Sequence, residues 1–130
     1  MNHEIFWLVA TIAMTAVFWL PYILNRIIEE GLISAIKNPK PDAPPKAAWA
    51  ARMVKAHNNA VENLVIFAPL VILVQITNSS SEMTLMACQV YFHARLAHFL
   101  IYSLGIPYFK TIAFFIGFLA QMALAYILLM

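Results

Sequence analysis

The chain has 130 residues, of which 63% are hydrophobic and only 11% are charged. Soluble domains carry about 25% charged residues, and a domain this small has a large surface to cover with them. The composition therefore argues against a soluble enzyme and a disordered chain, and the net charge of +2 against a nucleic-acid binder. An integral membrane protein remains, with enough length for about four spans of ~20 residues.

The apolar runs predict four helical spans, at about residues 5–24, 47–76, 82–104 and 108–130. The first span carries no charge, meets Pro21 near its end, and can continue in amphipathic form to Ile36. Four prolines make Lys37–Lys46 the main loop. Ser81 is placed to cap the third span, and Gly105 to end it. We predict one all-α transmembrane domain over residues 1–130, an integral membrane four-helix bundle.

The basic residues are distributed unequally between the predicted loops. The first loop with its flanks and the third loop hold seven of the eight, namely Arg26, Lys37, Lys40, Lys46, Arg52, Lys55 and Lys110. The N-terminus, the second loop and the C-terminus hold none. Because basic loops stay in the cytosol, a multi-pass membrane protein with both termini on the non-cytosolic side is expected.

Four polar residues of the second span share one helix face. At 100° per residue, Arg52, Lys55, Asn59 and Glu62 lie within about 80° of one another. Lipid cannot solvate this face, so it must meet protein, water or a ligand. A snorkelling helix end accounts for Arg52 and Lys55. Glu62 lies ~15 Å further along the helix, where a carboxylate must be paired or neutral.

A second polar face runs along the third span, where Tyr91, Arg95, His98 and Tyr102 fall on one side. Since this span runs antiparallel to the second, Arg95 and Glu62 lie at similar depth. We predict that they form an intramembrane ion pair, within one chain or between two copies. Such a pair alone would be a structural clamp. The amide, imidazole and phenol groups around it add more polarity than a clamp requires.

The polar groups define a cationic site that opens toward the cytosol and is flanked by lipid. Its donors are Arg52, Lys55, Arg95 and Lys110, with few acids among them. This arrangement suits a small anionic ligand that meets a lipophilic partner, and positive charge also favours a bound thiolate. No metal site is predicted, because Cys88 is the only cysteine and no second ligand at metal spacing accompanies a histidine.

Two segments, residues 52–63 and 94–102, resemble the second- and third-helix signatures of the MAPEG family, the membrane-associated proteins of eicosanoid and glutathione metabolism. The second of them reads Arg-x-x-His-x-x-x-Tyr from Arg95. The chain length, the order of the spans and the proline-rich first loop also match. The resemblance implies four transmembrane helices per subunit, a homotrimer, and glutathione as co-substrate, bound between subunits on the cytosolic side.

The resemblance also assigns roles to individual residues. The matching positions that line or brace the glutathione site are Arg52, Asn59, Glu62, Arg95, His98 and Tyr102, and Lys55 joins them from the polar face of the second span. Asn58 stands where a family member has arginine. Lys110 stands where the family has the arginine that activates the glutathione thiol. Lys110 and Arg95 are therefore the catalytic candidates, as cations that stabilise the thiolate.

The resemblance favours an enzyme embedded in the membrane, a glutathione-dependent transferase or peroxidase. Its second substrate would be a lipophilic electrophile or lipid hydroperoxide that the bilayer delivers. The alternative, motivated by Asn58 and Lys110, is a non-catalytic membrane module of the same scaffold that binds another lipid or anion. A transporter or channel subunit is disfavoured, because Leu64–Val74 and the last span offer no polar path across the membrane.

Overall fold

The computed structural model describes residues 2–37 and 44–130, which contain six α-helices and no strand. The helices are α1 (His3–Val17), α2 (Leu20–Glu30), α3 (Leu32–Ile36), α4 (Ala48–Ile76), α5 (Glu82–Leu104) and α6 (Phe109–Leu129). The prediction of an all-α chain is confirmed. Most of the loop predicted at Lys37–Lys46 lies outside the described residues.

The first predicted span is two helices with a break between them. α1 ends at Val17, and the chain leaves the helical hydrogen-bond pattern at Phe18 and Trp19 before α2 begins. Pro21 accounts for the break, because it has no N–H to donate to the carbonyl of Val17. The amphipathic continuation is likewise interrupted at Gly31, whose φ of 85° ends α2. The bounds of α4, α5 and α6 lie within one residue of the predicted helices.

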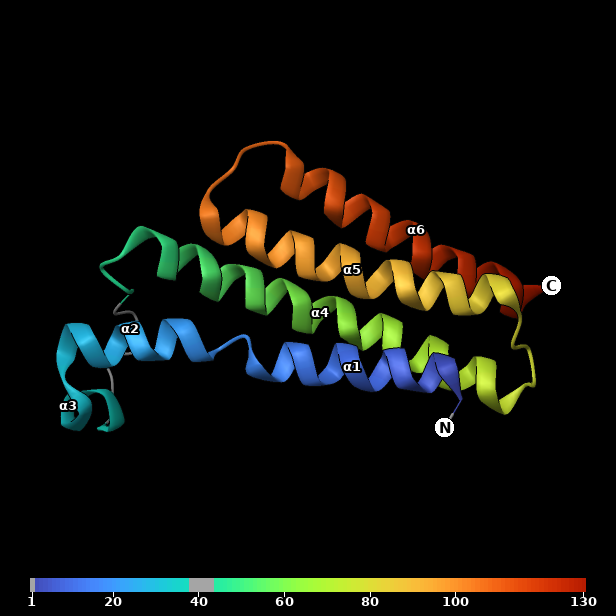
Figure 1. Cartoon of the computed structure of the whole chain (residues 1–130), viewed down its shortest axis with the longest axis horizontal. Coiled ribbons are helices and arrows are strands. Elements are labelled where there is room, and N and C mark those ends of the chain that lie inside the picture. The colour runs from blue at the N-terminus through green and yellow to red at the C-terminus, as the bar shows by residue number, and fades with distance from the viewer. Residues whose placement is uncertain (1, 38–43) are drawn as a thin grey trace.

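Three helical stretches of the described chain are long and apolar enough to cross a membrane: His3–Glu30, which joins α1 and α2, then α4 and α6. With 23 residues α5 has the length of a span, but its polar side chains make it less apolar than the other three. It lies between the other long helices in Figure 1 and packs against α1, α4 and α6. This position lets α5 carry polar groups that lipid would not accept.

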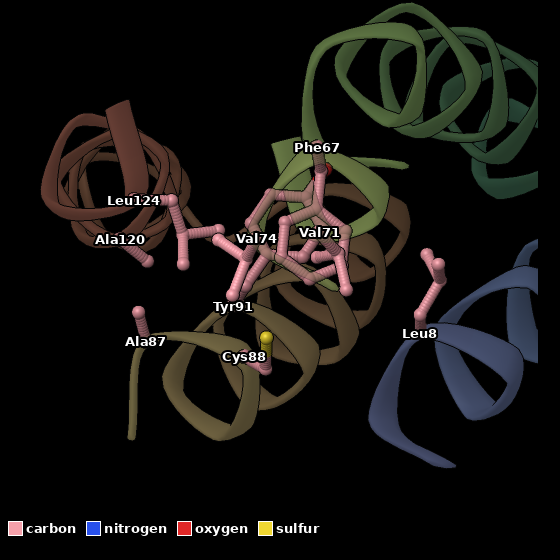
Figure 2. Close-up of a cluster of buried hydrophobic side chains, with 9 residues drawn as sticks. All are labelled: Leu8, Phe67, Val71, Val74, Ala87, Cys88, Tyr91, Ala120 and Leu124. Atoms are coloured by element: carbon pink, nitrogen blue, oxygen red, sulfur yellow. The ribbon is translucent and has the colours of Figure 1, made fainter. Parts of the chain in front are cut away.

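The helices enclose a core in the half of the molecule that holds both termini (Figure 1). Figure 2 shows Phe67 of α4 against Tyr91 of α5, with their rings stacked at 3.8 Å. Leu8 of α1 and Leu124 of α6 close the cluster on either side. Cys88 is fully buried here among the apolar side chains of the cluster. A smaller cluster, with Phe18 stacked on a phenylalanine of α5, lies beside the α1–α2 break.

Side-chain hydrogen bonds hold the starts of α4 and α5, from another helix at α4 and from local residues at α5. The carboxylate of Glu29 accepts the backbone N–H groups of Lys46 (3.0 Å) and Ala47 (3.1 Å), and so serves as the cap that α4 lacks in its own sequence. At α5, Ser81 and Thr84 form a reciprocal capping box, as the sequence predicted for Ser81. The first contact ties the start of α4 to α2, and the second determines where α5 begins.

Candidate functional site

Arg95 is the buried centre of the predicted site. Only 2% of the side chain is exposed, and its Nη2 donates a hydrogen bond of 2.7 Å to Oδ1 of Asn59 on α4. The guanidinium carbon also lies 6.0 Å from the ring centre of Phe114 on α6. Its Nε is buried and has no hydrogen-bond partner. Arg95 therefore joins three helices and retains a donor for a further acceptor.

The predicted ion pair of Arg95 with Glu62 does not form within one chain. In the part of the chain that the structure describes, Arg95 bonds to the amide of Asn59, and Glu62 is exposed. The two α4 residues are three positions apart, so Glu62 is turned about 60° from Asn59, which faces α5. The sequence left open whether the pair lies within one chain or between two copies. A pair between two copies stays a prediction.

Arg52 lies against the carboxyl end of α5. Its Nε donates to the backbone oxygen of Ser103 at 3.1 Å, where the last carbonyls of a helix favour a cation. Gly105 ends the helix with a φ of 75°. A Cβ at Gly105 would lie 2.9 Å from the guanidinium carbon of Arg52. Gly105 thus meets two requirements at once, the left-handed backbone and the close approach of Arg52.

A cavity of about 150 Å³ opens between the end of α5 and the start of α6. Its lining residues are His98, Tyr102, Lys110, Thr111 and Phe114. The ammonium nitrogen of Lys110 lies 4.2 Å from the ring centre of Tyr102, a cation–π contact that holds the charge at the cavity wall. His98 is 4% exposed, and its Nδ1 has no hydrogen-bond partner. The cavity therefore combines a cation, a phenol and a nitrogen without a partner.

The structure brings five of the eight predicted site residues into one connected group. Asn59 bonds to Arg95, and Phe114 contacts both Arg95 and the ring of His98. The His98 ring lies beside Tyr102, which in turn contacts Lys110. The remaining three lie around this group on α4. Arg52 is engaged with the end of α5, and Lys55 and Glu62 are exposed.

Two residues that support the site were not singled out in the sequence. The amide nitrogen of Asn63 donates to the backbone oxygen of Asn59 at 2.8 Å. Gln121 of α6 is 1% exposed and donates to the backbone oxygen of Asn63 at 3.1 Å. A signal for Gln121 was present, because it is the only amide side chain in α6. Buried amides of this kind bridge helices where lipid offers no hydrogen bonds.

Two other histidines have contacts outside the site. His57 shares a hydrogen bond of 2.7 Å between its Nδ1 and the hydroxyl of Tyr22, which links α4 to α2 beyond the helix break. His93 bonds through Nδ1 to the backbone oxygen of Gln89, and its ring lies beside Trp7. Neither histidine lines the cavity that contains Lys110.

Comparison with known proteins identifies the family of this chain. No curated protein and no solved structure matches it. The sequence model of the MAPEG family, however, matches residues 5–130, which is almost the whole chain. The match includes both polar helix faces and the cavity between α5 and α6. The chain is therefore a member of the MAPEG family.

Proposed function

We propose that this protein is a membrane-embedded, glutathione-dependent transferase or peroxidase that acts on lipophilic electrophiles. The observation that carries the proposal is the cavity in which His98, Tyr102 and Lys110 meet, next to buried Arg95, in a chain of the MAPEG family. Family membership supports glutathione metabolism in a membrane as the general setting. The residues of the cavity support the chemistry.

Lys110 and Arg95 would have different roles at the cavity. Positive charge close to a thiol favours its thiolate, and the thiolate is the nucleophile in glutathione conjugation. Tyr102 holds the ammonium of Lys110 at the cavity wall. There the ammonium can stabilise the negative charge of the thiolate sulfur, which then attacks an electrophilic carbon. Arg95 has a buried Nε without an acceptor, which suits a carboxylate or the thiolate of the tripeptide.

The site is proposed to be completed by a second copy in a homotrimer. A cavity of about 150 Å³ is smaller than the ~300–1,000 Å³ of most ligand sites. Lys55 and Glu62 lie exposed on α4, although charged groups at that depth require polar partners. A neighbouring subunit would enclose these side chains and enlarge the cavity. All four long helical stretches, α5 included, are proposed to cross the membrane in this assembly.

The distribution of basic residues supports an orientation. In Figure 1 the starts of α4 and α6 lie at the same end as α2 and α3, and the described Lys and Arg residues other than Arg95 belong to these segments or directly adjoin them. Both termini lie at the opposite end. By the positive-inside rule the basic end and its cavity face the cytosol, and both termini face away from it.

Replacement of Lys110 tests the catalytic proposal. In Lys110→Ala, glutathione conjugation to a panel of lipophilic electrophiles should fall at least about tenfold, because one electrostatic stabiliser of the reacting sulfur is lost. Lys110→Arg should retain activity. Lys37→Ala, which removes an exposed lysine at the same end, is the matched control. An unchanged rate in Lys110→Ala with an intact assembly would remove the proposed role.

Mixed assemblies test whether two copies share a site. Glu62→Gln and Lys110→Ala should each lower activity when expressed alone. If Glu62 of one copy and Lys110 of its neighbour act at the same site, an assembly that contains both variants forms some sites with both native residues. Such an assembly should recover part of the activity. Recovery no greater than the sum of the two separate variants would contradict a shared site.

The non-catalytic alternative rests on Lys110, which cannot offer the forked hydrogen bonds of the arginine that the family has there. A module of this kind would bind an anion or lipid at the same cavity without chemistry. It predicts no glutathione-dependent turnover with any electrophile, although glutathione or another anion still stabilises the protein.

A further inference from the structure

A second hollow, of about 340 Å³, lies at the opposite end of the molecule from the cavity that Lys110 lines. It is formed by the start of α1 and by the turn that joins α4 to α5, which lie together near the N-terminus in Figure 1. Its polar lining includes His3, Glu4, Ser80, Ser81 and Glu82. The volume falls within the usual range for a small-ligand site.

Glu4 is the unusual residue of this hollow. It is only 4% exposed, and its Oε2 is buried without any hydrogen-bond partner. Burial of a carboxylate oxygen without a donor is costly. The side chain of Asn2 is no donor to it, because its amide bonds to Gln75 and its oxygen accepts the backbone N–H of Glu4. Glu4 therefore places a carboxylate without a hydrogen-bond donor beside the hollow, and this group suits a ligand that donates hydrogen bonds.

The charges around the hollow favour a cation. Two carboxylates, Glu4 and Glu82, contribute to its lining, and no Lys or Arg does. The described Lys and Arg residues lie at the other end of the molecule, except Arg95 inside α5. Among the described residues neither carboxylate forms an ion pair, so no described Lys or Arg neutralises them.

The lining discriminates between kinds of cation. The described residues contain no group of three His, Cys, Asp or Glu side chains that could hold a metal ion. A quaternary ammonium prefers a cage of aromatic rings, and the hollow is lined by no Phe, Tyr or Trp. A primary ammonium, in contrast, supplies three N–H donors to Glu4, Glu82 and the serine hydroxyls. The chemistry of the lining therefore fits a primary ammonium.

We propose that this hollow binds a primary ammonium group, carried by a phospholipid headgroup or by a free amine. The hollow lies where the apolar stretches His3–Glu30 and Ala48–Ile76 reach their ends, which is the level of lipid headgroups if these stretches cross the bilayer. The proposal concerns the end of the molecule that is remote from Lys110, so it does not depend on glutathione binding.

The test measures thermal stability of the purified full-length protein in an uncharged maltoside detergent. The four probes are short-chain phosphatidylethanolamine, short-chain phosphatidylcholine, ethanolamine and choline, each titrated separately. A ligand of the folded state raises the unfolding temperature with concentration. We expect saturable stabilisation by phosphatidylethanolamine and none of comparable size by phosphatidylcholine or choline. Ethanolamine separates the sources: stabilisation by it indicates a free-amine site, and its failure beside an active phosphatidylethanolamine indicates a headgroup site.

Two variants assign the effect to the hollow. Glu4→Gln, which keeps the shape and removes the charge, should weaken the apparent affinity for phosphatidylethanolamine at least about tenfold. Glu30→Gln removes an exposed carboxylate at the other end and should leave the affinity unchanged. If Glu4→Gln cannot be purified, Glu82→Gln on the exposed side of the hollow replaces it, again with weaker binding expected.

Three outcomes would overturn the proposal. One is the absence of any shift with both primary amines. Another is an equal shift with phosphatidylcholine, which would indicate a general effect of lipid. The last is an unchanged affinity for phosphatidylethanolamine in Glu4→Gln. If Glu4→Gln cannot be purified, an unchanged affinity in Glu82→Gln has the same meaning.

Discussion

At the scale of single residues, Arg95 shows how a buried cation can be kept inside a helical membrane protein without a carboxylate. Asn59 accepts one of its N–H groups, and Asn63 in turn braces Asn59 from the next helical turn. Since a neutral amide cancels no charge, the positive charge of Arg95 is not neutralised within its own chain. An ion pair with Glu62 in the same chain would have left less of it for an anionic ligand.

Loss of the Asn59 side chain should leave Arg95 without its acceptor. We expect Asn59→Ala to lower the free energy of unfolding in detergent by about 2–3 kcal/mol, because a buried charged donor loses its partner. Asn58→Ala is the matched control, since Asn58 is the exposed neighbour, and it should change stability by less than about 0.5 kcal/mol. Equal effects of the two substitutions would show that Arg95 does not need Asn59.

A second variant allows the contact of Gly105 with Arg52 to be separated from backbone strain. The backbone of Gly105 is left-handed helical, with φ of 75° and ψ of 23°, and a Cβ there would meet Arg52. In an Arg52→Ala background, Gly105→Ala should cost about 1–2 kcal/mol from the backbone alone. In the native protein it should cost at least about 1 kcal/mol more, because Arg52 must leave the carbonyl of Ser103. Chemical unfolding in the two backgrounds measures the difference, and equal losses would refute a role for Arg52 at the end of α5.

At the scale of helices, α4 is held at its start by a residue from another element. Ala47 occupies the cap position but has no side-chain acceptor, and Glu29 of α2 supplies one across the intervening loop. This contact fixes where α4 begins, and it therefore influences the positions of Arg52, Asn59 and Glu62 along the axis of the bundle. The geometry of the site thus depends partly on a carboxylate that takes no part in it.

Removal of the Glu29 carboxylate should loosen the start of α4. We expect Glu29→Ala to lower the free energy of unfolding, because the backbone N–H groups of Lys46 and Ala47 lose their acceptor. Exposed Glu30 is the control, and Glu30→Ala should stay within about 0.5 kcal/mol of the native protein. Hydrogen exchange at the first amides of α4 should speed up in Glu29→Ala. Unchanged exchange there would exclude the proposed capping.

The sequence predicted the helices well and their lateral contacts less well. Ser81 and Gly105 mark the ends of α5 because capping and left-handed backbone are local properties. Angles along one helix also grouped Arg52, Asn59 and Glu62 correctly as a face. They could not decide which edge of that face meets α5, because the rotation of a helix against its neighbour depends on packing. Asn59, and not Glu62, is therefore the residue of α4 that bonds to Arg95 within the chain.

At the scale of the whole molecule, the two ends differ in charge and in the ligands that they suit. The end with α2 and α3 is basic and holds the cavity of His98, Tyr102 and Lys110. The end with the termini is acidic and holds the hollow of Glu4 and Glu82. Because basic segments stay in the cytosol, this asymmetry supports the proposed orientation, in which the anionic ligand binds on the cytosolic side.

The proposed trimer has a direct test in native mass spectrometry of the detergent-solubilised protein. Assemblies of three 14.7 kDa chains are expected, since a single copy leaves Lys55 and Glu62 exposed and the cavity small. Glu62→Lys should reduce the trimer fraction, because it places a cation where the neighbouring Arg95 is expected. A monomer at all detergent concentrations would contradict a site shared between copies.

The most direct test of the central claim is the binding of glutathione to the purified protein, read as a rise in unfolding temperature. A saturable rise at millimolar glutathione is expected, with its loss in Arg95→Ala, assembly of that variant being confirmed by its mass. His98→Ala should weaken the effect as a second variant of the same cavity. No rise in the native protein at glutathione concentrations well above millimolar would contradict the glutathione site.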